Sequence, residues 1–173
     1  MPLVLRKTRT NTIWDKSANE FSWLEKGDIA ADAVTDLATS DNDLSIYVIN
    51  DDLSQLDRCL SALAASRMRL IPLDYILFDK SVIDRLGLET NAVEGNLLDI
   101  EVNKLHRNII ELSASKLIKL SNIIMDECKL KRILDDQVAN IIANSINNKW
   151  IKAKSIHKNL LEDIEKHYPI ETL

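Results

Sequence analysis

Three aspartates follow the two segments that most resemble strands. Asp51 and Asp52 come directly after residues 44–50, and Asp79 follows the apolar stretch 70–78. Acidic residues at the carboxyl ends of strands are where open α/β sheets hold cations, and Mg²⁺ takes one or two carboxylates together with water. These three are therefore the candidate metal ligands, in a metal-dependent hydrolase. The favoured alternative is a capping box in which Asp52 and Gln55 begin the next helix.

A second candidate site is a block of acidic residues. Eight aspartates and no Lys or Arg lie between residues 28 and 57. Such a block attracts a basic partner or a cation. The alternative is a set of helix caps and turn residues facing solvent, for which aspartate is favoured. The candidate partner-binding residues are Asp28, Asp32, Asp36, Asp41 and Asp43.

Basic residues surround a tryptophan near the end of the chain. Lys149, Trp150, Lys152 and Lys154 lie in the segment N-K-W-I-K-A-K. Lysines interleaved with an aromatic ring can bind phosphates and stack on bases, so these four are candidate nucleic-acid contacts. The favoured alternative is a helix whose lysines extend into solvent while Trp150 faces the core.

Other catalytic motifs are missing from the sequence. The three glycines, Gly27, Gly87 and Gly95, lie too far apart for a phosphate-binding loop or a nucleophile elbow. His106, His157 and His167 have no second histidine or cysteine at the helical spacing of a metal pair. We therefore assign no catalytic residue and expect no cofactor.

Charge and cysteine content indicate the class of protein. The net charge is −5, which is not the charge of a dedicated nucleic-acid binder. Residues 1–100 carry 10 basic and 17 acidic side chains, whereas residues 101–173 carry 12 and 10. Cys59 and Cys128 lie far apart in apolar patterns, as expected for reduced thiols in the cytoplasm. No segment resembles a signal peptide or a membrane span, so we expect no membrane association.

The elements that must position these residues differ between the two parts of the chain. In residues 1–90 we expect strands at 3–7, 12–15, 44–50 and 70–78, and a helix starting at Asp28 with Asp32 and Asp36 on its exposed face. A second helix follows Asn50, and a short one over 81–86 ends at Gly87. This pattern predicts a small α+β domain.

The remainder is expected to be helical. Apolar residues recur at helical spacing over 101–125, 129–147 and 150–167, and Pro169 ends the last segment. Short connections favour antiparallel packing, so residues 98–168 are predicted to form a helical bundle region. The predicted fold class is α+β, with a small N-terminal sheet and its helices followed by a C-terminal three-helix segment.

Three segments resemble a family of small uncharacterised bacterial proteins. They are W-L-E-K-G-D-I-A-A-D-A at 23–33, L-S-I-Y at 44–47 and L-S-A-S-K-L at 112–117. The resemblance covers most of the chain and implies an accessory protein from a mobile or defence-related locus. It implies no catalytic residue.

The leading hypothesis is therefore a non-catalytic protein–protein interaction protein, or an accessory subunit of a bacterial complex. Its acidic block would bind a protein partner, or the chain would form a homo-oligomer. The first alternative is nucleic-acid binding through the basic helical part. The second is the metal-dependent hydrolase with its aspartate cluster.

Overall fold

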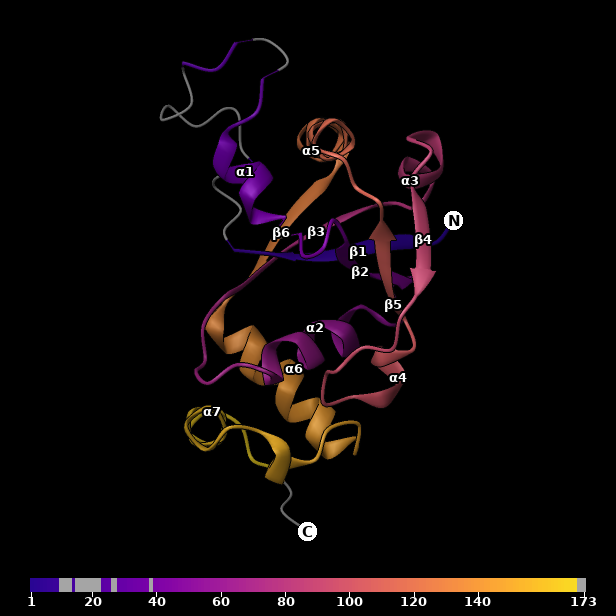
Figure 1. The fold of residues 1–173 in the computed structure, drawn as a ribbon. Coiled ribbons are helices and arrows are strands. Elements are labelled where there is room, and N and C mark those ends of the chain that lie inside the picture. Colours follow the sequence, from indigo (N-terminus) through magenta and orange to yellow (C-terminus); the bar gives the residue numbers. More distant parts are fainter. Residues whose placement is uncertain (10–13, 15–22, 26–27, 38, 171–173) are drawn as a thin grey trace.

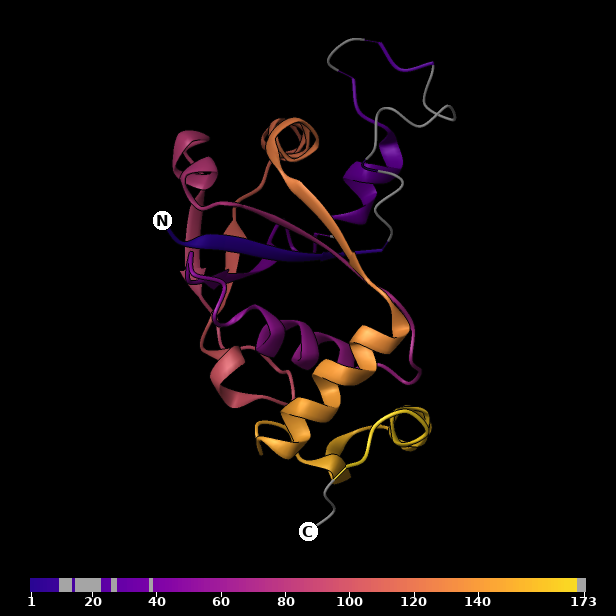
Figure 2. The ribbon, with the colours of Figure 1, turned by 180° about the vertical axis from the view of Figure 1, so that it is seen from behind.

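The computed structural model describes residues 1–9, 14, 23–25, 28–37 and 39–170. They form one antiparallel six-stranded sheet in the order β4-β5-β2-β1-β3-β6, with helices on both faces (Figures 1 and 2). The predicted α+β class is confirmed. The strand expected at 12–15 lies outside the described residues apart from Trp14. The strands are β1 (Leu3–Thr8), β2 (Leu44–Ile49), β3 (Leu73–Asp79), β4 (Glu89–Ala92), β5 (His106–Ile110) and β6 (Lys129–Ile133).

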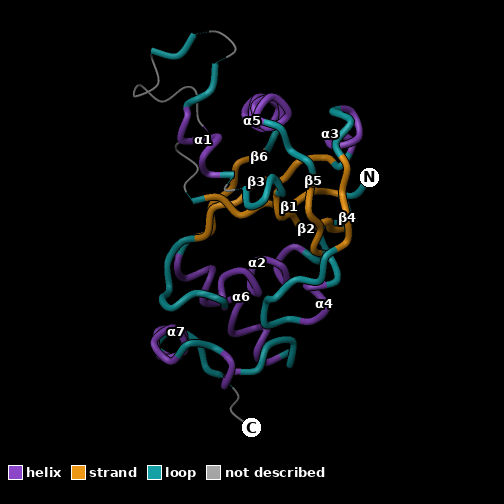
Figure 3. Tube along the Cα trace, viewed as in Figure 1, coloured by secondary structure: helices purple, strands orange, loops and turns teal. Residues whose placement is uncertain are grey.

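The helices divide into two layers, one on each face of the sheet (Figure 3). One layer holds α1 (Ala31–Asp36), α3 (Ser81–Arg85) and α5 (Ala114–Glu127). The other holds α2 (Leu56–Ala65), α4 (Ile100–Asn103), α6 (Asp135–Asn147) and α7 (Lys158–Glu165), with a short 3₁₀ helix at Ala153–Ser155. Successive residues of a strand point to opposite faces, so Val4 packs under the first layer and Leu5 under the second.

Two of the helices expected in the second part of the chain contain strands. Residues 106–110 lie within the predicted helix 101–125 but form β5, which pairs with β2 from Leu44↔Ile109 to Tyr47↔His106. Glu111 follows with a φ of 53°, and this left-handed conformation interrupts any continuous helix from 101 to 125. The apolar spacing there arises because β5 leads directly into the amphipathic helix α5.

The helices expected at 129–147 and 150–167 also differ from the prediction. Residues 129–133 begin the expected helix 129–147 but form β6, which pairs with β3. The expected helix 150–167 is replaced by the 3₁₀ helix and α7, because Ile156 and His157 between them are extended.

The expected boundary at residues 90–98 falls at the end of β4, and strands from both sides of it join the same sheet.

The centre of the sheet is paired unevenly. β1 pairs with β3 along its whole length, from Leu3↔Asp79 to Thr8↔Asp74. It pairs with β2 through only three residue pairs, from Leu3↔Ile49 to Leu5↔Tyr47. The sheet therefore consists of two three-stranded halves, β4-β5-β2 and β1-β3-β6, that are joined at one end and separate beyond Leu5.

A cross-strand ion pair stabilises the half of the sheet formed by β1, β3 and β6. Arg132 of β6 lies opposite Asp74 of β3 and donates from Nε and Nη2 to its two carboxylate oxygens, both at 2.7 Å. Asp74 is buried, and this bidentate contact compensates its charge.

Among the helices that the structure describes, none combines the length and apolar character that a membrane crossing needs.

The β1–β2 pairing can be tested through Leu5, whose side chain is fully buried beneath it. We expect Leu5→Ala to lower the free energy of unfolding by about 2–5 kcal/mol, because it leaves a cavity where the two halves meet. Urea unfolding followed by far-UV circular dichroism measures this change. Met68→Ala is the control, since Met68 is 63% exposed and should change stability by about 0.5 kcal/mol or less. A loss below about 1 kcal/mol for Leu5→Ala would contradict the central role of this pairing.

Candidate functional site

Two buried side-chain atoms of the described residues lack a hydrogen-bond partner, namely Arg6 Nε and Asn122 Oδ1. Buried polar atoms are almost always hydrogen-bonded, so each exception requires an explanation. Arg6 lines a cleft between β1 and β2, and Asn122 lines a groove between α1 and α5. These two hollows are the candidate sites.

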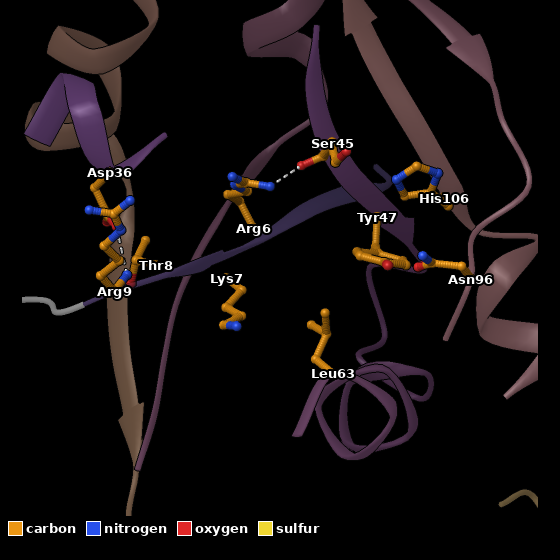
Figure 4. Close-up of a pocket in the computed structure, with 10 residues that line it drawn as sticks. All are labelled: Arg6, Lys7, Thr8, Arg9, Asp36, Ser45, Tyr47, Leu63, Asn96 and His106. Carbon is orange, nitrogen blue, oxygen red and sulfur yellow. Dashed lines mark hydrogen bonds and ion pairs between the residues drawn. The ribbon is translucent and has the colours of Figure 1, made fainter. Parts of the chain in front are cut away.

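The β1–β2 cleft lies where the two halves of the sheet separate. It has a volume of about 320 Å³ (Figure 4). Four lining residues belong to β1 or directly follow it, and two belong to β2. The other four come from neighbouring segments. The lining residues are Arg6, Lys7, Thr8, Arg9, Ser45, Tyr47, Asp36, Leu63, Asn96 and His106. The cleft exists because neither strand supplies backbone pairing across this gap.

Arg6 bridges the gap with its side chain. Its Nη1 donates to the carbonyl oxygen of Ser45 at 2.8 Å, and its Nη2 donates to the carbonyl of Leu37 at 2.6 Å. The guanidinium thus takes over hydrogen bonds that a regular strand pair would make through its backbone. Burial lowers the pKa of Arg6 from its ordinary value, because removing the cation from water is costly.

Two further cations lie beside Arg6. Burial lowers the pKa of Lys7, and the nearby positive charges of Arg67 and Arg6 lower it further. Arg9 follows with a largely exposed side chain, and its Nε lies 3.9 Å from the Asp36 carboxylate. That carboxylate also accepts from the Arg9 backbone amide at 2.7 Å and from Trp14 Nε1 at 2.9 Å. The described residues that line the cleft therefore include three basic side chains and one carboxylate that is already hydrogen-bonded.

The opposite end of the cleft is aromatic and polar. The rings of Tyr47 and His106 lie 5.2 Å apart between centroids, and His106 Nδ1 lies 2.9 Å from the carbonyl oxygen of Val93. A carbonyl oxygen only accepts, so Nδ1 is the donor. Burial raises the pKa of Tyr47 to about 12, and this hydroxyl therefore stays protonated at neutral pH. This end places a protonated tyrosine hydroxyl and an imidazole ring beside the cations.

The α1–α5 groove is the second hollow and has a volume of about 510 Å³. Asp28, Ile29, Ala31, Val34 and Thr35 line one side, and Ile118 and Asn122 of α5 line the other. Ile118 is 46% exposed although it is an isoleucine in the middle of a helix. Ile118 and Asn122 are four residues apart and so share one face of α5. The groove thus combines apolar side chains with hydrogen-bond acceptors.

The acidic block is divided between surface and core. Asp28, Asp32 and Asp41 are exposed, and Asp43 is half-buried with a carboxylate oxygen 3.3 Å from Asn108 Nδ2. Asp36 was expected on the exposed face of its helix, and this prediction is wrong because its side chain is buried. The last turn of α1 faces Trp14 and Arg9, whose N–H groups compensate the buried carboxylate.

The three candidate metal ligands are bound to neighbouring groups. Asp51 accepts from the N-terminal ammonium at 2.5 Å, and Asp52 accepts from Ser54 through the backbone amide at 2.9 Å and the hydroxyl at 2.7 Å. Asp79 accepts from the Ser81 amide at 2.8 Å. Within the described part of the chain, no three His, Cys, Asp or Glu side chains are placed to hold a metal ion.

The capping box expected after Asn50 does not form. Gln55 Oε1 accepts from the Asn50 backbone amide at 3.0 Å, while α2 starts at Leu56. Asp52 therefore shapes the turn before the helix instead of capping it, because its carboxylate is bound to Ser54 two residues later.

The basic segment is a loop that leads into the 3₁₀ helix at Ala153–Ser155, rather than part of an α-helix. Lys149, Lys152 and Lys154 are exposed, and Lys149 has a φ of 62°. The ring of Trp150 is 38% exposed, and the guanidinium of Arg58 lies 4.7 Å from its centroid. Arg58 in turn donates to both oxygens of the buried Asp99, at 2.6 and 2.9 Å. Trp150 therefore packs on a structural ion pair, and nucleic-acid binding here stays a prediction.

Apart from Asp36, the residues of the β1–β2 cleft were not among the sequence-based candidates. The run R-K-T-R at residues 6–9 was the available signal, because consecutive cations are unusual in a central strand of an acidic protein. Recognising them as a site also requires the separation of β1 from β2, which depends on pairing with distant strands.

No family model matches the chain, and comparisons with curated proteins and with solved structures also find no match.

Both cysteines are predicted to be unreactive in the folded protein. Burial raises the pKa of Cys59 and of Cys128 to about 12. At pH 8 we expect slow reaction with a thiol reagent until the protein is unfolded, because only the thiolate attacks. The free energy of unfolding should also fall as the pH rises above about 9, because the thiols of the unfolded chain lose protons that the thiols of the folded protein retain. Absorbance with Ellman's reagent, with and without denaturant, measures the reactivity. Rapid labelling of both thiols in the native state would contradict this expectation.

Proposed function

We propose that this protein is a non-catalytic interaction protein that binds a basic amphipathic helix of a partner protein in the α1–α5 groove. The observation that supports it is the unpartnered, buried Asn122 Oδ1 beside the exposed apolar side chain of Ile118. A partner that covers this region can donate a hydrogen bond to the unpaired acceptor. It can also remove the apolar side chain from contact with water.

The charge of the groove favours a basic occupant. Asp28 is the one charged residue among the described residues that line the groove, and Asp32 is exposed on α1, which begins three residues after Asp28. Lysine or arginine side chains of a partner can pair with these carboxylates and donate to Asn122. Apolar residues at helical spacing on that partner would contact Ile29, Val34 and Ile118.

The chemistry of the lining favours binding over catalysis. It consists of apolar side chains, a carboxylate, an amide and one hydroxyl. That hydroxyl, on Thr35, donates to the carbonyl oxygen of Ala31 at 3.0 Å and is thus engaged within α1. Such a set can hold a helix, whereas bond cleavage would need an activated nucleophile or general base.

The wider roles stay predictions. An accessory subunit of a bacterial complex and a homo-oligomer are compatible with a docking groove, and the resemblance to small bacterial proteins implies the former. The nucleic-acid and hydrolase alternatives gain no observation from the described residues that favours them over the groove.

The groove can be tested with a labelled helical peptide that has leucine on one face and lysine on the other, followed by fluorescence anisotropy. We expect Ile118→Glu to weaken binding about tenfold or more, because it places a charge in the apolar contact. Asp28→Asn should weaken binding less, and mainly at low salt. Ile100→Glu is the matched control, since Ile100 is 69% exposed on α4 in the other helix layer and should bind as the wild type does.

A second peptide with glutamate in place of lysine tests the charge requirement. It should bind weakly or not at all to the wild-type protein. Circular dichroism checks that the wild-type protein and Ile118→Glu are both folded. If the two folded proteins bind the basic peptide with equal affinity, the proposed groove is wrong.

A further inference from the structure

We infer that the β1–β2 cleft is a separate binding site for the phosphate group of a small phosphate-bearing molecule. This site goes beyond the proposed partner groove, since its ligand is a small anion and not a protein helix. The inference depends on the position of three cations, on an unpaired donor and on the size of the cleft.

The unpaired donor is the clearest indication of an anion. Arg6 Nε is buried and has no acceptor, although the two terminal nitrogens of the same guanidinium are bonded to Ser45 and Leu37. These two carbonyl contacts hold the guanidinium in place before any ligand arrives. A fixed N–H group that lacks an acceptor is completed by an oxygen atom that carries negative charge.

The arrangement of the cations favours an anion with several oxygens. Figure 4 shows Arg6 directed toward β2 and Lys7 directed toward Leu63 on the other face of the sheet, with Arg9 beside Asp36. An anion in the gap can therefore be approached from both faces of the separated strands. A phosphate group carries up to two negative charges and three free oxygens, so it can accept from several donors at once.

The cations of the cleft favour an added negative charge. Desolvation lowers the pKa of Arg6, and desolvation together with the positive charges of Arg67 and Arg6 lowers the pKa of Lys7, so the charged form of each side chain is destabilised. Among the described residues that line the cleft, Asp36 is the one carboxylate, and its oxygens are bonded to Arg9 and Trp14. An added phosphate would stabilise the cations that Asp36 leaves uncompensated.

The size of the cleft indicates a small ligand. Its volume of about 320 Å³ lies at the lower end of pockets for small molecules, which span roughly 300–1,000 Å³. Beyond the cations, the Ser45 and Asn96 side chains and the Tyr47–His106 pair can contact the group to which the phosphate is esterified. Free phosphate and a phosphate ester share the anion chemistry, and only the ester would also contact the Tyr47–His106 end of the cleft.

Isothermal titration calorimetry of the full chain against inorganic phosphate and against adenosine monophosphate tests the site. We expect binding of at least one, with affinity that falls as the salt concentration rises. Tighter binding of the monophosphate would identify an ester as the ligand, and equal binding would identify the phosphate group alone. Lys7→Gln should weaken binding about tenfold to a hundredfold, because it removes a charged donor without removing a contact of the folded chain.

The control variant is Arg69→Gln, which removes an exposed cation that does not line the cleft and should leave the affinity unchanged. In the ¹⁵N-correlated NMR spectrum, the Arg6 Nε–H signal, assigned through Arg6→Lys, should shift on titration with phosphate. A second readout is the midpoint of thermal unfolding, which a ligand of the folded state raises.

The absence of heat with both compounds at millimolar concentration and low salt would overturn the inference. Equal weakening by Lys7→Gln and Arg69→Gln would overturn it as well, because it would indicate nonspecific attraction. Failure of this site is distinguishable from failure of the partner groove, since Ile118→Glu leaves the lining of the cleft intact and Lys7→Gln leaves the groove intact.

Discussion

The three residue pairs between Leu3–Leu5 of β1 and Tyr47–Ile49 of β2 are the constraint on which the rest of the structure depends. They alone join the half β4-β5-β2 to the half β1-β3-β6 by strand pairing. The same short stretch separates the two cores, because Val4 and Leu5 point to opposite faces and pack under different helix layers. Burial on both faces compensates for the small number of pairs, since each buried apolar side chain stabilises the junction.

The early end of this pairing creates the β1–β2 cleft. Once the strands separate, their facing backbone groups need other partners, and the Arg6 side chain supplies donors to Ser45 and Leu37. Arg6 thereby becomes a structural bridge and part of the lining of a hollow. Cationic side chains therefore line this cleft in a protein whose net charge is −5, and burial lowers the pKa of Arg6 because the cation is removed from water.

The helix α1 contributes to both hollows. Its last residue, Asp36, lines the β1–β2 cleft, while Ala31, Val34 and Thr35 line the α1–α5 groove. The residue after it, Leu37, offers the carbonyl that fixes Arg6. The two unpaired buried atoms are complementary in kind, a donor in the cleft and an acceptor in the groove. The two proposed ligands differ accordingly, with an anion proposed for the cleft and a donor-rich basic segment proposed for the groove.

Local sequence patterns were sufficient to identify several elements. The alternation over 44–50, the helical spacing after Asn50 and the apolar run leading to Phe78 identify β2, α2 and β3, because each pattern reports one face of one element. Residues 106–110 and 129–133 could be recognised as strands only in the folded protein, since β2 and β3 supply their partners from more than 50 residues away. The tertiary structure also buries Asp36 and places Arg6, Lys7 and Arg9 around a cleft. The physical reason is that strand pairing and charge compensation join residues distant in the chain, and local periodicity carries no record of those partners.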